Sequence, residues 1–381
     1  MKNMNDKLFW DKYLKYLIVK LENLLNQHRK YYLVDLHIHT AASSDGSDTF
    51  LQKIKRAKEE KFDIISITDH DTFAAYDELY DLITRHEICI DDVPIIIPGI
   101  EFSVYYEKYN GLCHVLEYFC NPKSLKSVEK EKVNIDAYWK RCKIQFERLN
   151  YNPALNYYRL KYDIHFSEEE YFNYLKREGE LYPEYKSLID YIYLKLQEKN
   201  ITISDVKEKI SELLIYDQCN ERKEKMKLKL EEYQRRHRNE DINLCSRLLM
   251  PLLAPVGIDD ADYLDEEPRG SLSIGKYGQL NIREMEGEGI YILAHPDVER
   301  LGLLLNDIPF LGTDILGYEI NANNWKSTGK EIEFCANKNG FLISLGSDSH
   351  SVKDSIYINK QCFLYEWGYL QKLYLKAKVL V

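Results

Sequence analysis

Histidines and carboxylates recur where short apolar segments of this 381-residue chain end. The first example is the string Asp-Leu-His-Ile-His-Thr at 35–40, which continues an apolar run. If this run is a strand, His37 and His39 point to the same face, because side chains alternate along a strand. Two neighbouring imidazoles can bind one divalent metal ion. An H-x-H pair alone is a weak signal, so the interpretation depends on the remaining segments.

Similar residues accompany the later segments, and six of the ten histidines lie at such positions. Beyond the first string, the candidates are Asp45, His70, Glu101, His114, His295, Asp348 and His350. A donor set that mixes imidazole nitrogens with carboxylate oxygens suits Zn, Mn or Fe better than Ca or Mg. A carboxylate such as Glu101 can also bridge two ions. The sequence therefore predicts a centre of divalent metal ions.

Seven apolar segments are expected to form the strands that carry these residues. They are nearly continuous in Ile, Val and Leu, as in strands that are buried on both faces of a parallel sheet. The segments are 31–39, 62–70, 94–103, 113–119, 289–296, 315–321 and 340–350. Helix-like segments at 50–61, 73–86 and 326–338 alternate with them, which indicates an α/β fold. Active sites of α/β barrels lie at the C-terminal ends of the strands, so the ligand positions favour a barrel.

Two further regions lie outside this pattern. Residues 7–30 have the spacing of an amphipathic helix, expected to pack on the barrel. The region between the fourth and fifth segments is rich in Lys, Glu and Tyr and has no Gly or Pro from 184 to 250. We expect three parts: an N-terminal helix (1–30), a barrel (31–123 and 275–381), and a helical insertion (124–274) that acts as a lid or binds a protein partner. The basic run 235–238 is expected to be a solvated helix face, with phosphate contact as the alternative.

The bulk composition limits the classes of function. A net charge of −10 gives no general basic surface for nucleic acid, although bound metal ions would cancel carboxylates locally. Eight scattered cysteines without a C-x-x-C pair are typical of reduced thiols in a cytoplasmic protein. The sequence has no apolar stretch long enough for a membrane span or typical of a signal peptide, so we expect neither.

The strings D-L-H-x-H-T, S-D-G, T-D-H-D-T, G-x-E-x-S, A-H-P and G-S-D-x-H occur in an order that resembles the polymerase and histidinol phosphatase (PHP) superfamily. The resemblance covers about 31–121 and 275–351. It implies a distorted seven-stranded, TIM-like (β/α)7 barrel that holds two or three divalent metal ions. The nine ligands that it implies are His37, His39, Asp45, His70, Glu101, His114, His295, Asp348 and His350.

Within that superfamily, the chain is most similar to stand-alone 5′-to-3′ exoribonucleases and nucleoside 3′,5′-bisphosphate phosphatases. The resemblance implies hydrolysis of phosphate esters, of nucleotides or of nucleic-acid 5′ ends, by a metal-bridged hydroxide. One departure is Val115-Leu-Glu117 after His114, where this branch usually has Leu-Gly. Two alternatives stay open: a phosphatase for sugar or amino-acid phosphates, and a non-catalytic interaction module that keeps metal for stability.

Several residues other than the candidate ligands are also expected to contribute to the site. Asp35, Asp69 and Asp71 adjoin ligands and are expected to orient them, with proton donation by Asp71 as the alternative. Arg141 and Arg148 lie seven residues apart on an expected helix and are candidates for substrate phosphate. The residues that end the sixth segment, Tyr318, Glu319 and Asn321, are expected to line the pocket. The glycines Gly46 and Gly346 are expected to serve turn geometry.

Overall fold

The computed structural model describes two compact units of the chain. The described residues are 2–43, 46–106, 111–149, 153–177, 183, 185–202, 205, 280–296, 313–322, 325–326, 328–351 and 360–381. The first of the two units, here called the barrel unit, comprises Met1–Tyr106, Leu112–Asn134 and Gln279–Val381. The second, the helical unit, comprises Glu107–Gly111 and Ile135–Gly278.

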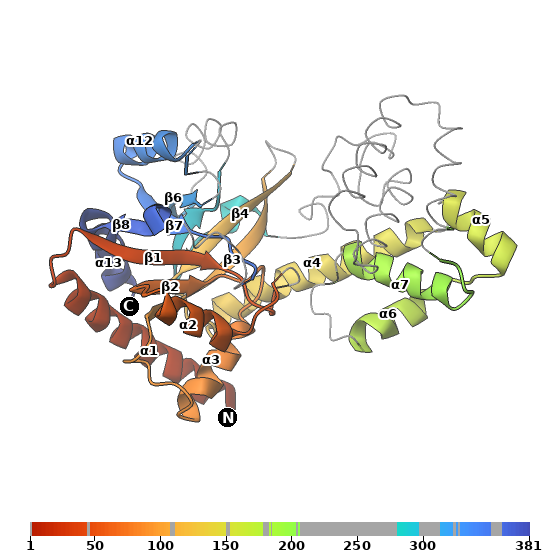
Figure 1. The fold of residues 1–381 in the computed structure, drawn as a ribbon, viewed down its shortest axis with the longest axis horizontal. Helices are drawn as coiled ribbons and strands as arrows, with labels where there is room; N and C mark the ends of the chain where they lie inside the picture. Colours follow the sequence, from red (N-terminus) through yellow and green to blue (C-terminus); the bar gives the residue numbers. More distant parts are fainter. Residues whose placement is uncertain are drawn as a thin grey trace. The chain divides into compact units, whose positions relative to one another are not determined.

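An eight-stranded sheet forms the centre of the barrel unit, with the strand order β7-β6-β5-β4-β3-β2-β1-β8 (Figure 1). The strands are β1 (Tyr31–Ile38), β2 (Ile64–Ile67), β3 (Ile95–Tyr106), β4 (Gly111–Tyr118), β5 (Ile290–Leu293), β6 (Ile315–Asn321), β7 (Leu342–Gly346) and β8 (Leu364–Glu366). All seven expected segments contain a strand, and the α/β barrel fold is confirmed. The eighth strand, β8, was not expected; it has three residues and pairs antiparallel with the start of β1.

Strand β4 breaks the parallel arrangement. Strands β1, β2 and β3 are parallel to one another, as are β5, β6 and β7, but β4 runs antiparallel to β5. The beginning of β4 therefore lies at the same edge of the sheet as the C-terminal end of β5. This reversal explains why the candidate ligand His114 lies near the start of its strand, whereas His37 lies near the end of β1 and His70, His295 and Asp348 follow β2, β5 and β7.

Backbone hydrogen bonds between the ends of β1 and β7 close the sheet into a barrel. The N–H of His39 donates to the carbonyl of Ser349 at 2.9 Å, and the N–H of Asp348 donates to the carbonyl of His37 at 2.8 Å. The buried carboxylate of Asp35 adds a third link by accepting from the N–H of Ser347 at 2.8 Å. Closure at this point brings the first and last ligand strings of the chain together.

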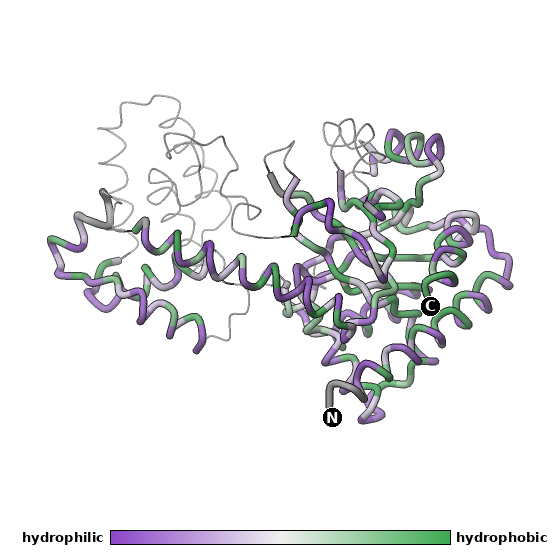
Figure 2. Tube along the Cα trace, turned by 180° about the vertical axis from the view of Figure 1, so that it is seen from behind, coloured by the Kyte–Doolittle hydropathy of each residue, from purple (hydrophilic) through white to green (hydrophobic). Residues whose placement is uncertain are grey.

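Helices cover the outside of the barrel. They are α1 (Lys2–Leu25), α2 (Phe50–Glu59), α3 (Ala75–Thr84), α12 (Gly329–Asn339) and α13 (Trp367–Leu380), with short 3-10 helices at Ile282–Glu284 and Lys360–Phe363. Helix α2 starts at a capping box formed by Thr49 and Gln52. Helix α1 alternates between apolar and polar residues along its length (Figure 2). Its buried residues include Trp10, and Tyr13 donates a hydrogen bond to the carbonyl of Ile96 on β3.

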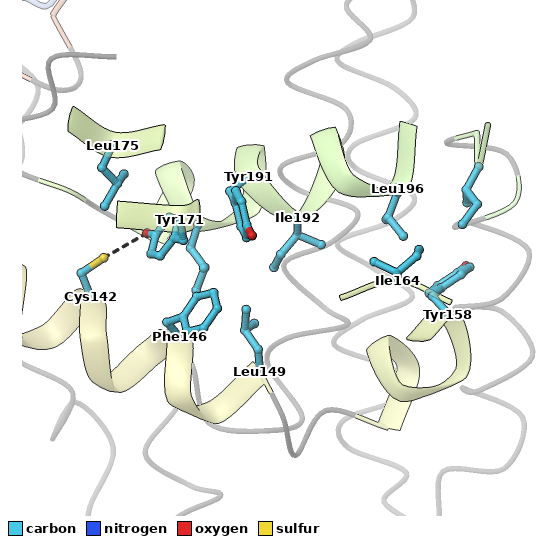
Figure 3. Packing of buried hydrophobic residues seen from close by; sticks show 12 residues of the cluster. Cys142, Phe146, Leu149, Tyr158, Ile164, Tyr171, Leu175, Tyr191, Ile192 and Leu196 are labelled. Carbon is cyan, nitrogen blue, oxygen red and sulfur yellow. Dashed lines mark hydrogen bonds between the residues drawn. The ribbon is translucent and has the colours of Figure 1, made fainter. Parts of the chain in front are cut away.

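The helical unit has a hydrophobic core of its own (Figure 3). Helix α4 (Leu125–Leu149) begins in the barrel unit and ends in the helical unit, which also contains α5 (Pro153–Tyr162), α6 (Glu168–Arg177) and α7 (Tyr185–Gln197). Phe146 stacks on Tyr171 with ring centroids 5.3 Å apart, and the thiol of Cys142 donates to the Tyr171 hydroxyl. The basic run 235–238 lies outside the described residues. Lid or partner-binding roles for this region stay predictions.

Two further observations concern the described residues of both units. In the part of the chain that the structure describes, no helix has the length and apolar character needed to cross a membrane. The described cysteines are free thiols.

Tyr76 offers a test of how the helices are attached to the barrel. Its buried hydroxyl donates to the carbonyl of Ile67 at 2.6 Å and accepts from the N–H of Gly99 at 2.8 Å, which joins α3 to β2 and β3. Tyr76→Phe removes these bonds inside the core, so we expect the free energy of unfolding to fall by about 2 kcal/mol. Denaturant unfolding measures the change. Tyr31→Phe, at a partly exposed position on β1, is the control and should change it by less than about 0.5 kcal/mol. Equal effects of the two variants would contradict this role of Tyr76.

Candidate metal centre

Eight of the nine predicted ligands converge at one edge of the barrel. The ninth, Asp45, lies outside the described residues. The side chains of His37, His39 and Glu101 are fully buried. The remaining five are partly exposed, from 19% for the His70 side chain to 34% for that of His350. The cluster therefore has a buried floor and a face that is open to solvent.

The Glu101 carboxylate lies at the centre of this cluster. Its Oε2 is 3.0 Å from His37 Nε2, 3.2 Å from His39 Nε2 and 3.1 Å from His70 Nδ1. Its other oxygen, Oε1, contacts two imidazoles from the opposite part of the sheet. These are His114 Nδ1 at 3.1 Å and His295 Nε2 at 3.2 Å. A single carboxylate thus has five imidazoles around it.

Asp348 and His350 complete the described cluster on the side of β1. Asp348 Oδ1 lies 3.2 Å from His39 Nε2 and 3.6 Å from His37 Nε2. The ring of His350 stacks on that of His39 with centroids 4.5 Å apart. These contacts place the last ligand string of the chain directly against the first.

The donor atoms fit divalent metal ions. Three groups have their donor atoms within 4.8 Å of one another: His39, His70 and His350; His37, His39 and Asp348; and His70, Glu101 and His114. His37 Nε2 and His39 Nε2 face each other at 3.1 Å. Two imidazole lone pairs at this distance repel each other unless a proton or a cation lies between them. The mixture of nitrogen and oxygen donors matches Zn, Mn or Fe.

Burial and charge act against each other in this cluster. Burial alone would raise the pKa of Glu101, but the imidazoles of His37, His70 and His114 hold that pKa well below its ordinary value. Burial alone would lower the pKa of His37, but the carboxylates of Glu101, Glu319 and Asp348 raise it well above its ordinary value. The Glu101 carboxylate is therefore stabilised as an anion, which is the form that binds a cation.

Unusual backbone conformations aim several of these side chains. Asp71, His295 and Asp348 follow strands and have left-handed φ values of 54°, 26° and 57°. Residues other than glycine rarely adopt this region, and such strain is concentrated at functional sites. A backbone bridge between His70 and Glu101 fixes two of the candidate ligands side by side.

Each of the three candidate orienting residues bonds to a segment that carries candidate ligands. Asp69 accepts from the N–H and the hydroxyl of Thr40 at 2.6 and 2.7 Å. Asp71 accepts from the N–H of Ser103 at 2.8 Å and from the Asn134 amide. Asp35 bonds to Ser347, and burial raises the pKa of this carboxyl to about 6. These bonds support a role in orienting the ligands rather than in donating a proton. For each of the three residues this role stays a proposal.

Sequence reasoning missed the role of Glu319. It was expected only to line the pocket, yet its Oε1 accepts from His37 Nδ1 at 2.8 Å and its Oε2 accepts from the N–H of His295 at 2.7 Å. The only sequence signal was a carboxylate within a strand that is otherwise largely apolar.

Gly46 and Gly346 were expected to serve turn geometry. Neither is among the described residues with positive φ, so a left-handed backbone is not what requires glycine there. A Cβ on Gly46 would overlap the backbone of Thr40, and one on Gly346 would overlap Glu319 and His37. Both positions need glycine because other atoms approach closely.

Glu117, the departure from the usual string after His114, belongs to the core. Its carboxylate accepts from the Tyr291 hydroxyl at 2.8 Å and pairs with Lys130 at 3.4 Å. A Cβ on Gly289 would overlap the Glu117 side chain, so the two residues fit each other. The departure is explained by packing inside the barrel unit.

The two candidate phosphate-binding arginines belong to the helical unit. The Arg141 guanidinium lies over the Tyr138 ring, 4.8 Å from its centroid. Arg148 lies on the same helix, α4. Contact of either residue with substrate stays a prediction.

The chain is similar in part to several known proteins. The chain is 38% identical over 77 residues to the 5′-3′ exoribonuclease Rnm of Salmonella typhimurium and to that of Escherichia coli; the match covers 20% of this chain and only 25% of each relative. Among solved structures, a "putative metal-dependent phosphoesterase" from Bifidobacterium adolescentis aligns with a TM-score of 0.49 and 16% identity, over 90% of this chain and 96% of that chain. An amidohydrolase from Chromobacterium violaceum aligns with a TM-score of 0.42 and 15% identity, over 88% and 98%.

A model of the PHP domain matches residues 35–236, which is more than half of the chain. The match begins at Asp35 and includes the positions of five described candidate ligands, from His37 to His114. The structure places the other three, His295, Asp348 and His350, in the same cluster. This protein therefore belongs to the PHP domain family.

Proposed function

We propose that this protein hydrolyses phosphate esters of nucleotides or of nucleic-acid 5′ ends, using two or three divalent metal ions. The ligands would be His37, His39, Asp45, His70, Glu101, His114, His295, Asp348 and His350. The observation that carries the proposal is the Glu101 carboxylate with five imidazole nitrogens within 3.2 Å. When bound, such ions lower the pKa of water and neutralise charge on a phosphoryl group.

The burial pattern indicates how a phosphate would reach this centre. The fully buried residues His37, His39 and Glu101 form the floor, where water is excluded and electrostatic interactions are strong. His114, His295 and His350 keep 27%, 28% and 34% of their side chains exposed. A phosphate ester would approach across these exposed imidazoles, with its leaving group toward solvent.

The nucleotide part of the proposal rests on one observation. The 77-residue stretch shared with two 5′-3′ exoribonucleases favours a substrate with a sugar-phosphate backbone. That stretch spans a quarter of those relatives, so it bears on the class of substrate and not on the mode of cleavage.

Replacing His39 tests the metal centre. This residue contacts Glu101 and Asp348 and belongs to two of the three possible metal groups. We expect His39→Ala to lower both the metal content and the hydrolysis of bis-p-nitrophenyl phosphate by about 100-fold or more, because loss of residues that merely support ligands already costs about 10–100-fold. Elemental analysis and a rate assay before and after chelation measure the two effects.

The matched control for this experiment is His165→Ala. His165 is a largely exposed histidine of the helical unit that pairs with Asp163. It should leave metal content and rate unchanged. A wild-type protein that binds no Mn, Zn or Fe, or an active His39→Ala variant, would contradict the proposed centre.

A panel of substrates tests the nucleotide assignment. We expect hydrolysis of a 5′-phosphorylated RNA oligomer or of 3′,5′-bisphosphoadenosine in preference to sugar and amino-acid phosphates. Preference for the latter would make the protein a small-molecule phosphatase. Bound metal without hydrolysis of any substrate would make it a non-catalytic module.

Arg141 provides a separate test of substrate contact. Because a charge-assisted hydrogen bond contributes about 1.5–3 kcal/mol, Arg141→Ala should raise KM for 3′,5′-bisphosphoadenosine about tenfold or more. KM for bis-p-nitrophenyl phosphate, which has a single phosphate, should not change. The control is Arg177→Ala, because Arg177 also lies over a tyrosine ring of the helical unit, that of Tyr174. Equal KM values for wild type and Arg141→Ala would remove Arg141 from the substrate site.

A further inference from the structure

Glu319 is a fully buried carboxylate whose two oxygens bond to two different candidate ligands. It lies on β6, and its side chain has no exposed surface. Its Oε1 accepts from His37 Nδ1 at 2.8 Å, and its Oε2 accepts from the backbone N–H of His295 at 2.7 Å. His37 comes from β1 and His295 follows β5, so one side chain connects candidate ligands from two different strands.

Gly346 makes this connection sterically possible. Strand β7 lies next to β6, and its end is bonded to the end of β1. Gly346 is the last residue of β7, and a Cβ there would overlap both Glu319 Oε1 and the Cβ of His37. The missing side chain leaves the space through which Glu319 reaches past β7 to His37. Even alanine would displace one of the two partners.

The hydrogen bond determines which nitrogen of His37 faces the cluster. A carboxylate can only accept hydrogen bonds, so Nδ1 of His37 must carry the proton that it donates to Glu319. The other nitrogen, Nε2, faces the cluster, where it lies 3.0 Å from Glu101 Oε2, and is the atom that would bind a metal ion. Carboxylates that bond to the distal nitrogen of a ligating histidine fix its tautomer and increase its basicity.

The second contact acts on the backbone. His295 has a left-handed φ of 26°, which is unfavourable for any residue with a side chain. The bond from its N–H to Glu319 Oε2 holds the peptide in this conformation, in which the imidazole lies 3.2 Å from Glu101 Oε1. Glu319 therefore acts on His37 through the ring and on His295 through the main chain.

We propose that Glu319 is a positioning residue of the metal centre, which orients His37 and His295 for metal binding through a space that Gly346 leaves open. This inference rests on the proposed function, because it requires that the cluster binds metal. In this role Glu319 acts through His37 and His295 and does not itself bind the metal ions or the substrate.

Cobalt binding to the purified full-length protein tests the proposal. Co(II) has absorption bands that report the geometry of its ligands, so affinity and spectrum can be measured without any assay of activity. We expect Glu319→Gln to weaken Co(II) binding by about 10–100-fold and to change the spectrum of the bound ion. Gly346→Ala keeps the charge of Glu319 but closes its path, and should have the same two effects.

The control is Glu117→Gln. Glu117 is also a buried barrel carboxylate, with hydrogen bonds to Tyr291 and Lys130. It should leave Co(II) affinity and spectrum as in the wild type. Circular dichroism of the metal-free proteins identifies any variant that does not fold. If both Glu319→Gln and Gly346→Ala fail to fold, histidine side-chain NMR of the zinc-loaded wild type decides, with the proton of His37 expected on Nδ1.

The outcomes separate this inference from the proposed function. A wild type that binds no Co(II) would overturn the metal centre and the inference together. Wild-type affinity and spectrum in folded Glu319→Gln would overturn the inference alone, as would a proton on Nε2 of His37.

Discussion

The charge balance around Glu101 constrains the rest of the barrel unit. A buried carboxylate is costly unless cations or hydrogen-bond donors surround it. Here His37, His39 and His70 contact one oxygen, and two further imidazoles contact the other. These residues lie on or just after five neighbouring strands, β1 to β5, so the charge balance exists only when the sheet curves to bring them together. The curvature of the sheet, the burial of Glu101 and the metal site therefore depend on one another.

Topology decides which residues can take part. Closure between β1 and β7 places Asp348 beside His39, more than 300 positions apart in sequence. The reversal of β4 relative to β5 places His114 beside His295, with ring nitrogens 3.2 Å apart. In a fully parallel barrel the start of a strand would lie at the opposite edge, and His114 would be far from the other ligands. The antiparallel strand is therefore a requirement of the site.

The parts that could be predicted from sequence are those with a local signal. Continuous runs of Ile, Val and Leu identify seven strands, and each ligand string follows or begins such a run. The three-residue strand β8 is too short to show a pattern. The contact between His37 and Glu319 joins residues 282 positions apart, and the need for glycine at 346 follows from that contact. Such features depend on register and closure, which neither propensity nor spacing encodes.

The division of the chain into two units determines which substitutions can affect the metal ligands. The carboxylates that support the ligands, such as Asp69 and Glu319, bond to residues of the barrel unit itself. The helical unit packs around its own core, which includes Phe146 and Tyr171. Substitutions on its surface are therefore expected to leave the ligands undisturbed. Conversely, a change at Gly346 acts on the metal centre, because the atoms it would displace belong to His37 and Glu319. Under the proposed function, the described residues that hold and orient the metal ligands therefore all belong to the barrel unit.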